Sequence, residues 1–165
     1  MDPRDKTLNI VIVDPNPVRS AILRDGLREA GYQRIALIDD MHQLALQLYG
    51  ADPDVILIDM ENPSRDALEQ MFQVSPAVRR PIAMFVDESD SFMIQAAVDA
   101  GVSAYIVDGL TKGRVRSILE LTISRFNAFA SLRRELDEAK SALADRKVIE
   151  RAKGILMKRK GLGEE

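Results

Sequence analysis

The chain contains no cysteine and no tryptophan, and it has a single histidine among its 165 residues. Without cysteine it can form neither a disulfide nor a thiolate metal site, and His42 alone cannot supply a metal cluster. The longest apolar runs, VILI and PIAMFV, are far shorter than the roughly 20 residues of a membrane-spanning helix. The N-terminal MDPRDKT lacks the apolar stretch that secretion requires. We therefore expect a cytoplasmic protein that does not enter a membrane.

Charge is distributed unevenly along the chain, although the net charge is only −3. Residues 1–130 hold 13 basic and 19 acidic side chains, whereas residues 131–160 hold 10 basic and 5 acidic ones. A basic segment attracts phosphates over a long range, but a solvated helix with mixed charges has the same composition. The length suits one domain with its own core and an additional segment.

Apolar runs typical of strands recur at 8–13, 34–38, 55–58, 82–86 and 104–107. Between them lie helical patterns at about 41–49, 64–74 and 90–100, and a further helix opens with Asn16 as cap and Pro17 in the first turn, ending near Gly31. Strands that alternate with helices pair in parallel through right-handed crossovers. We predict an α/β fold with a five-stranded parallel, doubly wound sheet.

Acidic side chains follow several of the predicted strands. In such a sheet the ligand site lies beyond the carboxyl ends of the strands. We expect five residues to gather there, namely Asp14, Asp59, Val86, Asp87 and Asp108.

A long helix is predicted from Thr111 onward, since only Gly113 and Gly154 interrupt the helical pattern before Gly161. Within it, apolar residues three and four apart form a heptad stripe, which favours a coiled-coil dimer. The stripe consists of Phe129, Leu132, Leu136, Ala139 and Leu143. Beyond it the phase slips to a broader apolar face at Val148, Ile149, Ala152, Ile155 and Leu156, which suggests a different packing partner.

Several segments, in this order and spacing, resemble a response-regulator receiver domain of flavodoxin-like fold over residues 8–125: VIVDPNP, PDVILIDM, PIAMFVDESD and GVSAYIVDGL. The tail ADRKVIERAKGILMKRKG resembles the opening of an ANTAR domain, the RNA-binding module of transcription antiterminators. Together they are similar to the NasT type of nitrate-responsive antitermination regulator. The resemblance implies a receiver-like domain at 1–125, a coiled-coil linker at 126–145 and the first part of an ANTAR domain at 146–165, with further helices expected beyond Glu165.

The resemblance identifies Asp59 as the candidate phosphoacceptor. The rest of the implied pocket is degenerate: Asp14 matches the first of two metal-binding acids, but Pro15 replaces the second, Val86 replaces the switch hydroxyl and Asp108 replaces the phosphate-binding lysine. Mg²⁺ needs several oxygen ligands, so we expect at most weak binding at Asp14 and Asp59 and no other metal or cofactor. Repulsion from Asp108 would oppose a phosphorylated Asp59. We expect a pocket without cations, in which phosphorylation is disfavoured.

Residues 146–160 carry seven cations against Glu150 alone: Arg146, Lys147, Arg151, Lys153, Lys158, Arg159 and Lys160. They are candidate RNA contacts through phosphates. No aromatic residue follows Phe129 to stack on unpaired bases.

We predict a two-component regulator that is not an enzyme and that acts in transcription antitermination, binding a hairpin in nascent RNA as a dimer. Its control would come mainly from sequestration by a protein, by analogy a sensor of nitrate assimilation. The alternative is a conventional response regulator switched at Asp59. An aspartate-nucleophile phosphatase is a poorer match, because Asp14 is followed by Pro15 and Asn16 rather than by a second aspartate two residues on.

Overall fold

A computed structural model describes residues 1–161 of the chain and divides them into two compact units, one ending at Asn127 and the other beginning at Ala128. The first unit contains five parallel strands in the order β2-β1-β3-β4-β5. These strands are β1 (Ile10–Val13), β2 (Ile35–Ile38), β3 (Val55–Met60), β4 (Ile82–Val86) and β5 (Ala104–Val107). The predicted five-stranded parallel sheet is confirmed, and each strand lies within two residues of its predicted position or matches it.

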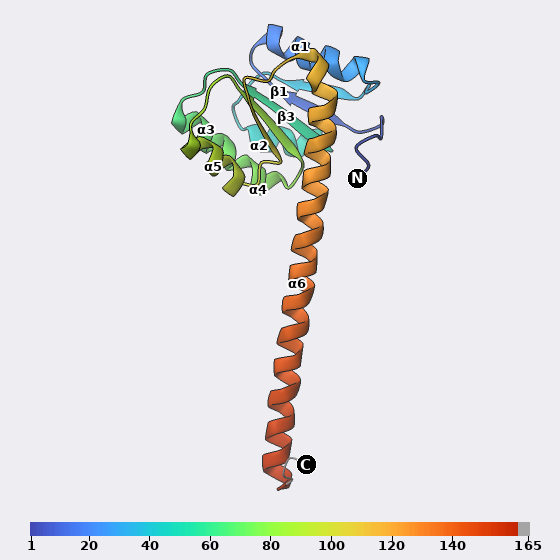
Figure 1. Cartoon of the computed structure of the whole chain (residues 1–165), viewed down its shortest axis with the longest axis vertical. Coiled ribbons are helices and arrows are strands. Elements are labelled where there is room, and N and C mark those ends of the chain that lie inside the picture. The colour runs from blue at the N-terminus through green and yellow to red at the C-terminus, as the bar shows by residue number, and fades with distance from the viewer. Residues whose placement is uncertain (162–165) are drawn as a thin grey trace. The chain divides into compact units, whose positions relative to one another are not determined.

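The helices are α1 (Pro17–Glu29), α2 (Leu44–Ala51), α3 (Arg65–Phe72), α4 (Val74–Val78), α5 (Ser91–Asp99) and α6 (Val115–Lys160), with a 3₁₀ turn η1 (Lys112–Arg114) before α6. Figure 1 labels these helices and the strands β1 and β3. Among residues 1–161, none of these helices has both the length and the apolar character needed to cross a membrane.

Two apolar layers cover the two faces of the sheet. One contains core residues of α2, α3, α4 and α5, and the other contains residues of α1 and of the first turns of α6. Strands β1, β3 and β4 are buried along almost their whole length, as expected for parallel strands covered on both faces. Because all five strands are parallel, their carboxyl ends lie at the same edge of the sheet.

Asn16 fixes the start of α1, as the sequence predicts. Its side chain accepts hydrogen bonds from the amides of Val18 (3.0 Å) and Arg19 (3.3 Å), and Pro17 occupies the first turn. This cap satisfies amides that have no partner within the helix. It also sets the first turn of α1, with Arg19 in it, next to the end of β1.

The helix predicted at about 64–74 corresponds to α3, and the short α4 follows it after Gln73. Pro76 explains why the two helices are separate. A proline has no amide proton and its ring clashes with the carbonyl four residues earlier, which here belongs to Phe72, the last residue of α3. The predicted helix is therefore confirmed as α3, whereas the short α4 that contains Pro76 was not predicted.

The start of α6 packs closely on α1 at Gly26. A Cβ atom added there would lie 2.9 Å from the Lys112 carbonyl oxygen and from Val115. Val115, Leu119 and Ile123 are buried in the same layer. The predicted long helix is confirmed as a single α6 of 46 residues, and its side chains from Ala128 onward are almost all exposed.

Candidate functional site

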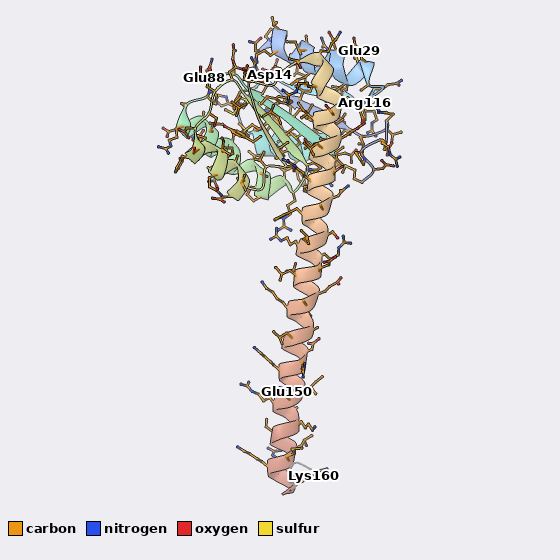
Figure 2. The ribbon with its side chains drawn as sticks, in the orientation of Figure 1. Asp14, Glu29, Glu88, Arg116, Glu150 and Lys160 are labelled. Atoms are coloured by element: carbon orange, nitrogen blue, oxygen red, sulfur yellow. The ribbon has the colours of Figure 1, made fainter. Side chains whose placement is uncertain are left out.

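The carboxyl edge of the sheet holds the acids that the sequence predicts there. Asp14 directly follows β1, and its amide donates a hydrogen bond to the Ile38 carbonyl. Asp59 lies near the end of β3, where it pairs with Phe85 of β4. Both residues are buried: 2% of the surface of Asp14 and 1% of that of Asp59 is exposed. Figure 2 labels Asp14, and Glu88 in the loop after β4.

The most informative contact in this pocket comes from Arg19, which the sequence analysis overlooked. Its Nε and one terminal nitrogen donate to the two oxygens of Asp59, the latter at 2.9 Å, and the same terminal nitrogen donates to Asp87 at 2.9 Å. The other terminal nitrogen reaches Asp87 at 3.3 Å. Guanidinium pairs of this two-pronged kind are among the stronger ion pairs in proteins. The prediction of a pocket without cations was therefore wrong.

A sequence signal for Arg19 did exist. The Asn16 cap and Pro17 define where α1 starts, and the first turn of a helix that follows β1 lies over the carboxyl edge of the sheet. An arginine two residues after Pro17, facing a buried acid at the end of β3, is placed to pair with it. The pairing itself spans 40 residues of sequence, so local pattern alone does not reveal it.

The loop after β4 is fixed at three points. Arg19 holds Asp87, the hydroxyl groups of Ser89 and Tyr105 lie 2.8 Å apart, and Asp90 accepts from the Met93 amide at 2.8 Å as cap of α5. In this arrangement the loop is tied to α1, to β5 and to its own following helix. Val86, at the end of β4, is buried between Met60 and Val107 and offers no donor to the pocket.

Asp108 differs from the two buried acids, Asp14 and Asp59, in its exposure to solvent. Its side chain is exposed and its backbone adopts φ 49°, with its amide bonded to the Val86 carbonyl. Among residues 1–161 no hydrogen bond or ion pair joins it to Asp14 or Asp59. Because solvent screens an exposed charge, Asp108 repels a phosphorylated Asp59 less strongly than a buried acid would. The ion pair with Arg19 has the larger effect on the charge of Asp59.

Asp14 is the least satisfied group of the pocket. Its Oδ1 accepts from the Asn16 amide at 2.8 Å, while its Oδ2 is buried without a hydrogen-bond partner among the described residues. Burial raises the pKa of Asp14 to about 6; the Asn16 hydrogen bond opposes the rise and the negative charge of Asp59 adds to it. Asp14 therefore holds a proton up to a higher pH than an exposed aspartate does.

The replacement Asp14→Asn tests this protonation. In the unfolded chain an aspartate titrates near 3.9, so between about pH 4 and 6 the folded state retains a proton that the unfolded chain releases. Stability then falls as the pH rises through this range. We expect the variant to lose that fall and to gain about 3 kcal/mol at pH 7, measured by urea denaturation across pH. The exposed Asp25→Asn is the control, and an unchanged pH profile of Asp14→Asn would refute the assignment.

The Mg²⁺ site that the receiver resemblance implies does not fit these residues. Pro15 supplies no side-chain oxygen, both oxygens of Asp59 already bind Arg19, and Asp87 is held by the same guanidinium. A divalent cation beside that guanidinium would meet repulsion rather than an open set of oxygens. Across residues 1–161 no three acids or histidines are arranged to share a metal ion.

The second candidate site is the basic end of α6. Its predicted RNA-contacting residues are exposed throughout: Arg146, Lys147, Arg151, Lys153, Lys158, Arg159 and Lys160. Arg146 pairs with Glu150 at 3.4 Å, and such exposed pairs contribute little. Figure 2 shows Glu150 and Lys160 on this part of the helix. That these seven residues contact RNA remains a prediction.

The heptad stripe is exposed in the single chain. Phe129 and Leu132 are each 64% exposed, and Leu136 and Leu143 are each 54% exposed. Exposed apolar side chains at this spacing are typical of a helix that pairs with another helix. The dimer seam remains a prediction.

Comparison with known proteins assigns both parts of the chain. The model of the response regulator receiver domain matches residues 10–120, and that of the ANTAR domain matches residues 137–165. The second match begins inside the segment predicted as a linker, and its last residues, 162–165, lie outside the described part of the structure. The transcriptional regulatory protein PdtaR of Mycobacterium tuberculosis is 27% identical over 155 residues, which cover 94% of this chain and 76% of that protein.

Solved structures agree on the fold. The signal receiver domain of a modulated diguanylate cyclase from Desulfovibrio desulfuricans superposes with a TM-score of 0.61 at 19% identity, covering 74% of this chain and 98% of that one. A response regulator from Thermotoga maritima gives 0.61 at 16% identity, covering 72% and 98%. The chain, homologous to PdtaR and carrying an ANTAR match after its receiver fold, belongs to the response regulator receiver domain family.

Proposed function

We propose that the protein is a transcription antitermination regulator of the NasT type, which binds a hairpin in nascent RNA as a dimer in the cytoplasm. The receiver match followed by the ANTAR match supports this assignment, and the excess of exposed cations near the end of α6 supplies charge for RNA phosphates. A sensor protein of nitrate assimilation is the partner that we propose for the receiver-like unit.

Control by protein contact rather than by phosphorylation rests on a single observation, the pairing of Arg19 with Asp59. A carboxylate attacks a phosphodonor through a free oxygen, whereas each oxygen of Asp59 accepts a hydrogen bond from Arg19. These groups are poorly exposed, at 17% for the Arg19 side chain and 0% for that of Asp59. Separating them leaves a buried charge without its partner, which is costly. The binding energy of a partner protein replaces covalent modification in this mechanism.

RNA binding is tested by titrating a generic RNA hairpin at several salt concentrations. We expect the affinity to fall steeply with salt, because each phosphate contact lowers the logarithm of the binding constant by about 0.9 per decade of salt. The double replacement Lys147→Gln with Arg151→Gln should reduce this slope by the amount that two phosphate contacts contribute.

The matched control is Arg24→Gln with Arg28→Gln, two exposed arginines of α1 that carry the same total charge. Equal losses in both double variants would point to net charge alone and count against the proposal. Binding that does not depend on salt would exclude the phosphate contacts altogether.

A further inference from the structure

We propose that the RNA-binding surface extends along α6 well before the basic end, as a cationic stripe formed by Arg133, Lys140, Lys147, Arg151 and Lys158. This inference rests on the proposed RNA-binding function and assigns it a second contact region. Arg133 and Lys140 lie within the segment of the predicted dimer seam, where no RNA contact was predicted.

The spacing places all five side chains on one side of the helix. Successive members are 7, 7, 4 and 7 residues apart, and an α-helix turns by about 100° per residue. The five positions therefore fall within about 40° of one another around the helix. From Arg133 to Lys158 the stripe is about 38 Å long, and every member is exposed.

The acids of α6 lie outside this stripe. Of the five acids between 131 and 160, the nearest in angle are Asp137 and Glu150, at least about 40° beyond its edges. The structure records i,i+4 ion pairs on α6 at Arg116 and at Arg146. Within the described chain no ion pair involves a member of the cationic stripe, so its charge is available to a ligand.

A coiled-coil role does not account for these cations. In the heptad set by the seam, Arg133, Lys140 and Lys147 occupy the e position, which in a parallel dimer faces the preceding g position of the other helix. Those g positions hold Ala128, Glu135 and Ala142. Only Lys140 therefore has an acid to pair with in a second copy. Arg133 and Lys147 have none, so the dimer leaves their charge unbalanced.

The chemistry favours nucleic-acid phosphates over an acidic protein. Three of the five members are lysines, which are depleted at the cores of protein interfaces. Double-stranded RNA is recognised largely through its shape and its phosphates, and a straight row of cations suits the backbone of a hairpin stem. The proposed ligand of the stripe is therefore the stem of the RNA hairpin.

Two adjacent arginines provide a matched test. Arg133 belongs to the stripe, whereas Arg134 is exposed on the same helix about 100° away. Each is replaced by glutamine in the full chain, and binding to a generic RNA hairpin is measured against salt. We expect Arg133→Gln to lower the salt slope by about one contact and to weaken binding several-fold. Arg134→Gln should leave both unchanged, and Arg133→Lys should restore most of the slope.

The outcomes separate this inference from the proposed function. If Arg133→Gln behaves like Arg134→Gln while Lys147→Gln with Arg151→Gln still weakens binding, the stripe is wrong and RNA binding by the ANTAR segment stands. If none of these variants changes the salt slope, both proposals fail. If Lys140→Gln lowers the dimer mass and leaves the slope unchanged, Lys140 serves helix pairing, and its place in the stripe is refuted.

Discussion

Replacing Arg19 by methionine is expected to lower the free energy of unfolding by about 3 kcal/mol or more. The replacement removes both hydrogen bonds to Asp59, whose side chain is fully buried. It leaves a buried carboxylate without a counter-charge, while Asp87 keeps a side chain that is 34% exposed and can return to water. The loss is measured as the shift of the urea denaturation midpoint at pH 7, above the pKa of Asp14.

Arg24→Met is the control for this prediction. Arg24 is an exposed arginine on the same helix, and its replacement should change stability by no more than about 0.5 kcal/mol. The double variant Arg19→Met with Asp59→Leu should regain much of the loss, because an apolar pair of similar volume can replace a buried ion pair. If Arg19→Met were as stable as the wild type, the ion pair would not hold the pocket together.

Replacing Leu132 and Leu136 by serine is expected to convert a dimer into monomers. Both leucines are more than half exposed in the single chain, and burying each should contribute about 1.5 kcal/mol or more. Four such side chains in a dimer contribute about 6 kcal/mol. Losing them raises the dissociation constant by about 10⁴-fold. Sedimentation or light scattering at micromolar concentration gives the mass.

A matched double variant on another side of the helix is Val148→Ser with Ile149→Ser. These residues are also exposed, at 67% and 66%, but they lie outside the heptad stripe, so the dimer mass should persist. A wild-type chain that is monomeric, or a leucine variant with unchanged mass, would refute the heptad stripe as a dimer seam.

The sequence predicted those features of the fold that depend on local pattern. Apolar runs located the strands, Asn16 and Pro17 located the start of α1, and an uninterrupted helical pattern predicted α6. The carboxyl-edge position of Asp14 and Asp59 followed from the parallel topology. The short helix α4 was not predicted, because Pro76 within it interrupts the helical pattern.

The pocket was predicted less completely than the fold, because its main contact is not local. Arg19 lies 40 residues from Asp59 and 68 from Asp87, so the cation comes from α1 and not from the position of the family's lysine after β5. Asp108 follows β5 at the carboxyl edge, as expected, but its backbone turns at φ 49° and its side chain is exposed.

The alternative of a phosphorylated Asp59 keeps one point in its favour, the presence of the acid at the end of β3. For phosphorylation, Arg19 would have to release at least one Asp59 oxygen and the loop held through Asp87 would have to move. A partner protein that changes the position of α1 or of this loop acts on the same contacts without covalent chemistry. The two mechanisms therefore differ in what the isolated protein does with a phosphoryl analogue.

The most direct test adds beryllium fluoride with Mg²⁺ to the purified protein and follows its mass and thermal midpoint, with Asp59→Asn in parallel. Because Arg19 already occupies Asp59, we expect no change in either quantity that distinguishes the wild type from Asp59→Asn. A stoichiometric shift in mass or thermal midpoint that disappears in Asp59→Asn would contradict the account and establish Asp59 as a working phosphoacceptor.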